Sequence, residues 1–299
     1  MEAAAVGAEK QDVTTVIAVS DNGSSTGVLK EELDIPAVGD IGKVLLSMAN
    51  VDQDFIKLLR YRFSREGSLH NHPVRNIMLA ALIDTKGNLT EATKYMAKIL
   101  KVKGTVLPLT EEKVELVGEG SRESYFGEES VSMNIRNIRN LSYDHEVKVC
   151  EEVKDKILDA DLIIFSPGSL YTSILPHLIA EEVVRTLNQT KAPLMYISNL
   201  VTQPGETDGY NVGDHVDVLN RYLGSRKIDV VIANDGEVEE EIRRKYLDLE
   251  RKEVVKPEGL KDTELIKEKV FSIDEEGRII HDALKTAYLV FSFMMNRGL

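Results

Sequence analysis

Residues 161–210 read DLIIFSPGSLYTSILPHLIAEEVVRTLNQTKAPLMYISNLVTQPGETDGY, and this segment decides the fold class. It contains two short apolar runs, at residues 162–165 and 194–197, and each ends in a small polar loop that contains glycine. A stretch with helical spacing separates the two runs, which is the order of elements in a parallel α/β sheet. Because such sheets bind ligands beyond the carboxyl ends of their strands, we expect the function at these two loops.

The same alternation extends over most of the 299 residues. Residues 13–19 (VTTVIAV) are β-branched and nearly unbroken, as expected of a strand buried on both faces, and residues 228–233 are expected to form a further strand. Residues 105–144 differ, with short alternating runs and many Gly, Ser and Glu residues. The sequence therefore predicts an α/β fold, a three-layer and mostly parallel sheet with a small inserted β-rich subdomain. We divide the chain into a first part of the α/β core, the inserted subdomain, and a second part of the core with a C-terminal helix: residues 1–104, 105–146 and 147–299.

Composition excludes several classes of partner. The formal charge of −13, from 37 basic and 50 acidic residues, argues against a general nucleic-acid or anionic-membrane surface. The single cysteine, Cys150, allows no internal disulfide, as expected in a reducing compartment. The start MEAAAVGAEKQD lacks the features of a signal peptide, and no apolar tract approaches the ~20 residues of a spanning helix. We expect a cytoplasmic protein with no nucleic-acid or membrane partner.

Five glycine- or asparagine-bearing loops fall where expected strands end or helices begin: residues 20–27, the turn before Gly39-Asp40, and residues 166–173, 198–210 and 233–237. They offer the amides and hydroxyls that a phosphate needs, although each alone is also ordinary turn composition. Together they indicate a nucleotide- or phosphate-binding protein. Asp21 and Asp40 are either ligands of a divalent ion such as Mg²⁺ or a loop acid and a helix cap, and both interpretations stay open.

No short motif assigns the chemistry. The sequence contains no GxxxxGK[ST], GxGxxG or HExxH, and Ser166 and Ser169 lack the GxSxG elbow of a hydrolase. His70 and His72 have no cysteine or acidic partner at zinc spacing. The residues thus identify no nucleophile and no general base.

Three runs, ADLIIFSPGSLYTSILP, NLVTQPGETDGYNVGDHV and ANDGEV, resemble the CofD-like superfamily. PGSLYTS and TQPGETDGY are specific to its gluconeogenesis-factor branch, whose members bind uridine-diphosphate sugars and affect cell shape. The more distant branch contains the 2-phospho-L-lactate transferases. The resemblance runs from about Val13 to Asp282 and implies a Rossmann-like core with a nucleotide across the strand ends. The matched positions that would line this site are Asp21, Asn22, Gly23, Ser24, Ser25, Gly27, Gly39, Asp40, His72, Asn76, Gly168, Ser169, Asn199, Gln203, Asn234 and Tyr246, the last matching a tyrosine that holds the nucleotide sugar.

Departures from the family's pattern concern mainly the first half of this site. Only twelve residues precede Val13, so the family's N-terminal strand, GGGTG loop and helix are missing. Asp40-Ile41 is followed by Gly42-Lys43 instead of Arg-Asn, and GHSxGN appears as NHPVRN, with Arg75 in place of a glycine. Ser166 replaces the glycine before PGS, and Ile280 stands where the family has arginine. A shortened form, a natural divergent relative and a start that lies upstream all remain open.

The leading interpretation is a nucleotide-sugar-binding regulatory protein of the gluconeogenesis-factor type, linked to central carbon metabolism and to cell-wall and cell-shape control. It would need no catalytic residue and no cofactor, with Mg²⁺ arriving only together with a nucleotide, and a homodimer stays open. One alternative is a phospholactate-transferase-like enzyme that uses a nucleotide diphosphate donor. The other is a degenerate scaffold without ligand.

Overall fold

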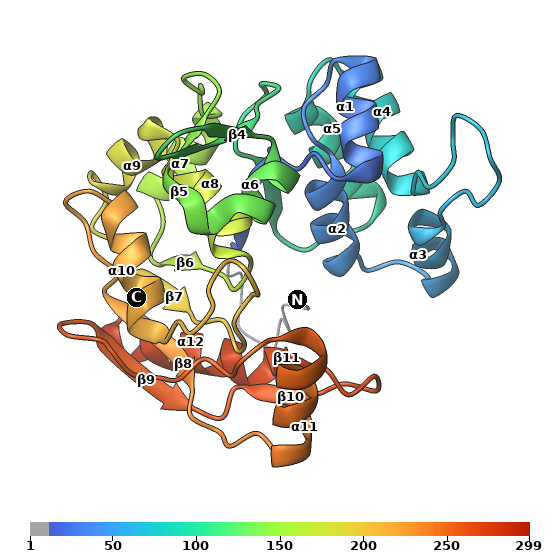
Figure 1. Ribbon diagram of the computed structural model, residues 1–299. Coiled ribbons are helices and arrows are strands. Elements are labelled where there is room, and N and C mark those ends of the chain that lie inside the picture. The colour runs from blue at the N-terminus through green and yellow to red at the C-terminus, as the bar shows by residue number, and fades with distance from the viewer. Residues whose placement is uncertain (1–11) are drawn as a thin grey trace.

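The computed structural model describes residues 12–299. All but the last residue of the N-terminal stretch MEAAAVGAEKQD lie outside the described residues. The first part of the chain pairs two strands in parallel, with Thr14 opposite Thr105 and Ile17 opposite Pro108. Five helices lie between these strands in sequence and gather on one side of the molecule (Figure 1). The elements are β1 (Thr14–Ile17), α1 (Ser24–Leu33), α2 (Gly39–Ser47), α3 (Gln53–Arg60), α4 (Val74–Lys86), α5 (Leu89–Ile99) and β2 (Thr105–Pro108).

The second part of the chain forms a four-stranded parallel sheet in the order β6-β7-β8-β9. Its two central strands, LMYI and VVIAN, are buried along their whole length, as expected of strands covered on both faces. The predicted α/β fold with a parallel sheet is thereby confirmed. The elements are α7 (Glu151–Leu158), β6 (Ile163–Phe165), η2 (Leu170–Ile174), α8 (Leu175–Leu178), α9 (Glu181–Leu187), β7 (Leu194–Ile197), α10 (Val212–Tyr222), β8 (Val230–Asn234), α11 (Glu240–Lys245), η3 (Tyr246–Glu250) and β9 (Glu264–Glu268).

An antiparallel unit lies between the two parts and contains three strands in the order β4-β3-β5. The first strand that we assigned to it, β2, instead pairs with β1, because TVLP is a buried apolar run that belongs to the core. The β-rich unit therefore begins after β2 and not at residue 105. Its elements are β3 (Leu116–Gly120), β4 (Ser124–Phe126), α6 (Glu128–Asn134), η1 (Ile135–Asn137) and β5 (Ile138–Tyr143).

The charged region after residue 250 contains three strands that the sequence pattern did not reveal. β9 (ELIKE) is the edge of the parallel sheet, where charged side chains are common because they discourage pairing with another chain. β10 (Phe271–Ile273) and β11 (Ile279–His281) then form an antiparallel pair before α12 (Ala283–Arg297). A second, smaller core lies here, with Tyr246, Phe271, Ile279 and Phe293 packed against apolar residues of β7 and β8.

Local signals explain several helix ends. Asn88 caps α5 by accepting a hydrogen bond from Glu91 N at 2.8 Å, a role for which asparagine is among the preferred residues. Asp40 is not a cap: it lies in the first turn of α2, after the cap residue Val38. Among residues 12–299, no helix is both long and apolar enough to cross a bilayer.

Candidate functional site

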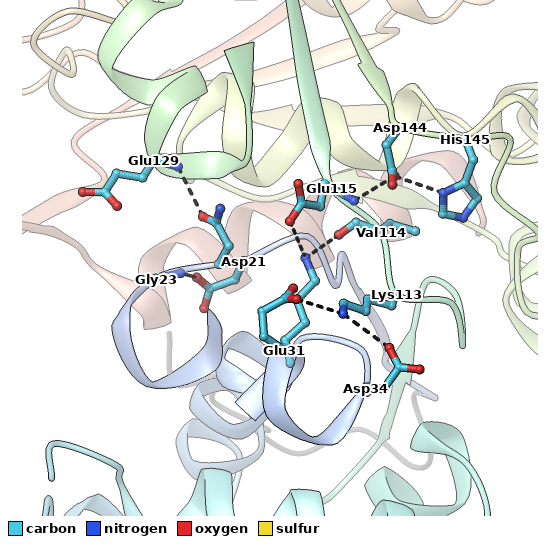
Figure 2. A network of polar contacts seen from close by, with 12 residues as sticks. Asp21, Gly23, Glu31, Asp34, Lys113, Val114, Glu115, Glu129, Asp144 and His145 are labelled. Atoms are coloured by element: carbon cyan, nitrogen blue, oxygen red, sulfur yellow. Dashed lines mark hydrogen bonds and ion pairs between the residues drawn. The ribbon is translucent and has the colours of Figure 1, made fainter. Parts of the chain in front are cut away.

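The loop after β1 is folded tightly against the start of α1. Gly23 N donates to Asp21 Oδ1 at 2.8 Å and precedes the first residue of the helix (Figure 2). A side chain at Gly27 would collide with the carbonyl of Asn22, so the loop can lie on the helix only with glycine there. Ser24 is the first residue of the helix.

The start of α2 meets the same loop. A Cβ on Gly39 would lie 2.6 Å from Asp21 Oδ2 and would also collide with the hydroxyl of Thr26 on α1. Neither α1 nor α2 has a side-chain cap at its first turn, so two helix N-termini with uncapped amides converge beside Asp21. Asp40, in the first turn of α2, forms an ion pair with Lys43 at 2.7 Å.

Three buried polar side chains join α1 to α4. Ser25 Oγ lies 2.9 Å from His72 Nδ1, and Asn76 Nδ2 donates to Ser25 Oγ at 3.2 Å. The amide oxygen Oδ1 of Asn76 is buried and has no hydrogen-bond partner among the described residues. Because a buried carbonyl oxygen without a partner is costly, this group offers an acceptor to a ligand.

Glu128 belongs to this group, although sequence reasoning missed it. Its carboxyl lies beside Asp21 and also interacts with Asp40 and with Thr172 of η2. Burial, followed by the negative charge of Asp21, raises the pKa of Glu128 to about 7. The residue comes from the antiparallel unit, which gave no reason to look for a site residue there.

Asn22 explains how α6 reaches the first loop. Gly127, with φ +82°, precedes α6, and a Cβ there would collide with the amide of Asn22. Asn22 Oδ1 accepts a hydrogen bond from Glu129 N at 3.3 Å. The antiparallel unit therefore forms one wall of the candidate site.

The two loops of residues 161–210 are held together by their own side chains. Asn199 Nδ2 donates to Gly168 O at 2.8 Å, and Gly168 N lies 3.4 Å from Asn199 Oδ1. Ser169 Oγ donates to Glu206 at 2.9 Å and accepts from Thr172 N at 3.1 Å. Burial raises the pKa of Glu206, while Tyr171 N and Ser169 donate to its carboxylate and oppose this rise. Glu206 is a second residue that the sequence did not single out.

The other expected residues of this half lie in turns or in the core. Gln203 O accepts hydrogen bonds from Glu206 N and Thr207 N in a tight turn. Asn234, at the end of β8, donates to Gly236 O at 3.0 Å, and its own oxygen accepts from Gly236 N. Tyr246 is 4% exposed, and its hydroxyl accepts from Ile279 N at 2.6 Å, which places its ring in the second core and not in an open site.

The structure thus brings together most, but not all, of the expected residues. The expected residues of the first loop, α2 and α4 form one group. A second group consists of Gly168, Ser169, Asn199 and Gln203. Glu128 connects the two groups, because it interacts with Asp21 of the first and with Thr172 beside the second. Asn234 and Tyr246 instead contact the β10–β11 region, which Figure 1 shows at the end of the molecule away from α1–α5.

The acidic side chains fit a magnesium ion only in company with a ligand. Within residues 12–299, no group of three or more His, Cys, Asp and Glu side chains is arranged to hold a metal ion. Mg²⁺ in nucleotide sites is commonly held by one or two carboxylates together with phosphate oxygens. Asp21 and Asp40 are therefore suitable as its protein ligands when a nucleotide supplies the rest.

Comparisons with known proteins agree with this architecture. Residues 3–274 match the family described as 2-phospho-L-lactate transferase CofD. The chain is 35% identical over 292 residues to the gluconeogenesis factor of Bacillus subtilis, covering 95% of this chain and 90% of that protein. The gluconeogenesis factor of Listeria monocytogenes is 35% identical over 240 residues, covering 79% and 74%. A solved structure of protein BH3568 from Bacillus halodurans has a TM-score of 0.87 at 29% identity, with 94% of this chain and 91% of that chain covered.

Proposed function

Because this chain belongs to the CofD family and has gluconeogenesis factors among its relatives, we propose that it binds a uridine-diphosphate sugar and acts as a regulatory protein. The regulated processes would be central carbon metabolism and the supply of cell-wall precursors, and through them cell shape. The protein would need no cofactor of its own, and Mg²⁺ would bind with the nucleotide.

One observation carries the proposal: the uncapped N-termini of α1 and α2 converge beside Asp21. Free amides and the positive ends of two helix dipoles attract a phosphate group. The diphosphate would lie there, with Mg²⁺ shared between its oxygens and the carboxylates of Asp21 and Asp40. The unpartnered oxygen of Asn76 would accept from the ligand. Gly168, Ser169 and Asn199 would keep the second pair of loops in place around the remainder of the molecule.

A thermal-shift panel of uridine, guanosine and adenine nucleotides, with and without Mg²⁺, tests this proposal. A ligand that binds only the folded state raises the melting temperature by mass action, so a uridine-diphosphate sugar should raise it more than the other nucleotides do. The absence of a shift at millimolar uridine-diphosphate sugar would overturn direct binding.

The structure supplies a matched pair of variants for the metal. Asp40 lies in the first turn of α2 and pairs with Lys43 at 2.7 Å, and Asp54 lies in the first turn of α3 and pairs with Lys57 at 2.8 Å. Asp40→Asn and Asp54→Asn lose the same local interactions, but only the first removes a carboxylate from the candidate site. Asp40→Asn should abolish the Mg²⁺-dependent part of the shift, and Asp54→Asn should retain it.

The regulatory role needs a test in cells. In a bacterium that lacks its gluconeogenesis factor, the wild-type chain should restore growth on a gluconeogenic carbon source. Asp40→Asn should restore it less well if ligand binding drives regulation. Equal rescue by both proteins would support a scaffold that acts without ligand.

A second candidate function is favoured by Glu128. A carboxyl whose pKa is raised to about 7 can take or release a proton at neutral pH, as general acid–base catalysis requires. With the family's description as a transferase, this suggests transfer of a phosphorus-containing group from a nucleotide diphosphate donor. Turnover of such a donor with Mg²⁺ tests it. Activity that Glu128→Gln and Asp21→Ala both leave unchanged would exclude these residues from the reaction.

A further inference from the structure

Arg75 is a buried cation without an anionic partner. It lies in the first turn of α4 and is only 7% exposed. Its Nε is buried and has no hydrogen-bond partner, and no carboxylate of residues 12–299 pairs with its guanidinium. Removing a charge from water without compensation is costly, so a native protein rarely keeps such a group without a reason.

The charges around Arg75 are also positive. Arg62 and Pro73 form an antiparallel β-bridge immediately before α4, and Arg60 is the last residue of α3. Burial lowers the pKa of Arg75, and the neighbouring charges of Arg62 and then Arg60 lower it further. Arg62 donates to the backbone oxygen of Asn71 at 2.7 Å and to no carboxylate. The charges that act on Arg75 are therefore positive, in a chain with 13 more acidic than basic residues.

Gly42 of α2 makes room for this arginine. A Cβ on Gly42 would lie 3.2 Å from Cδ and 3.4 Å from Cγ of Arg75, so the methylenes of Arg75 lie on the bare helix backbone.

We propose that Arg75, assisted by Arg60 and Arg62, forms an anion subsite that binds a phosphate group at the start of α4. The guanidinium presents parallel N–H donors that suit phosphate geometry, and a bound phosphate would compensate the buried charge. The subsite adjoins Asn76, the next residue of the same turn. It does not require the uridine-diphosphate sugar, because its phosphate can come from a nucleotide or from a separate phosphorylated molecule.

The test is the melting temperature in inorganic phosphate compared with sodium chloride of the same ionic strength. Wild-type protein should be stabilised by phosphate, and Arg75→Met should weaken phosphate binding roughly tenfold or more, since it keeps the methylenes over Gly42 and removes the charge. Without phosphate, Arg75→Met should melt no lower than the wild type, because it removes an uncompensated charge. Arg122→Met, on an exposed residue between β3 and β4, serves as the control and should respond to phosphate like the wild type.

Two results would overturn the subsite: no response of the wild type to phosphate, or an equal response of Arg75→Met. If Arg75→Met fails to fold, the exposed Arg62→Gln replaces it and should reduce the phosphate response, and an undiminished response then contradicts the proposal. Repeating the titration in saturating uridine diphosphate identifies the source. Loss of the phosphate response assigns the subsite to the nucleotide's own diphosphate, and a response that persists assigns it to a separate phosphorylated molecule. Failure of every uridine nucleotide to bind would leave the phosphate response intact, so the two proposals fail independently.

Discussion

The carboxyl group of Glu128 lies beside that of Asp21, across the boundary between the antiparallel unit and the first loop. Two carboxyl groups can share a hydrogen bond only while one of them carries a proton. Burial and the charge of Asp21 raise the pKa of Glu128 to about 7, so the pair holds its proton until near neutrality. A bound cation would take the place of this proton.

Glu128→Gln should therefore change how stability depends on pH. The pKa of Glu128 is higher in the folded protein than the ~4.3 of an unfolded chain, so protonated Glu128 stabilises the fold fully at acidic pH. This stabilisation is lost as the pH rises through about 7. Glutamine cannot ionise, so the variant should exceed the wild type in free energy of unfolding by about 1–2 kcal/mol near pH 8, after allowance for solvent screening. Urea denaturation between about pH 5 and pH 8 measures the difference.

Glu129→Gln is the control for that experiment. Glu129 is the next residue in the same turn of α6, but its side chain is exposed. Its variant should reproduce the wild-type pH profile. If the profile of Glu128→Gln also runs parallel to that of the wild type, the Asp21–Glu128 pair does not hold a proton as described.

Gly127→Ala should destabilise the fold more than Gly205→Ala. The two glycines have nearly the same φ, +82° and +83°, in the region that residues with a side chain rarely adopt. At Gly205 a Cβ meets no atom within 4 Å, whereas at Gly127 it collides with the amide of Asn22. We expect a loss of about 1 kcal/mol for Gly205→Ala and about 2–3 kcal/mol for Gly127→Ala, measured by urea denaturation. Equal losses would mean that Asn22 is not held against α6.

Tyr246→Phe separates a core role from a ligand role. The hydroxyl of Tyr246 accepts a hydrogen bond from Ile279 N, and the ring is buried. Removing the hydroxyl leaves a buried amide without a partner, which should cost about 1–2 kcal/mol of unfolding free energy. The affinity for a uridine-diphosphate sugar should not change, as isothermal titration would show. A large loss of affinity at unchanged stability would instead support the sugar contact that the family resemblance implies.

The elements that the sequence predicts well are those with local causes. β7 and β8 are continuous apolar runs because both faces of each strand are covered, and the residues themselves record this burial. The cap of α5 depends on Asn88 and a backbone amide three residues away. β9 was missed for a related reason: its exposed edge position allows the charged residues that hid its strand pattern.

Much of the site depends on contacts that no local pattern records. Glu128 reaches Asp21 only because α6, in the antiparallel unit, packs against Asn22. Tyr246 has the aromatic character of either a ligand contact or a core residue, and only the position of β11 decides between them. The contact of Arg75 with Gly42 is similar, since the two residues are far apart in the sequence and meet only in the fold.

Ser169→Ala should destabilise the second pair of loops, and by more at high pH than at low pH. Ser169 donates to Glu206 and accepts from Thr172 N, so alanine removes a donor from a buried carboxylate and a cap from the following turn. Burial raises the pKa of Glu206, which means that its protonated form stabilises the fold at acidic pH and that this contribution is lost as the pH rises. Without Ser169 the ionised form is less well compensated, so the loss of unfolding free energy should be about 1 kcal/mol where Glu206 is protonated and about 2–3 kcal/mol at the higher pH where it is ionised. Ser173→Ala, on an exposed residue of the same turn, should change stability little at either pH. An equal loss for Ser169→Ala at both pH values would show that Ser169 acts as the cap of Thr172 and not as the partner of an ionised Glu206.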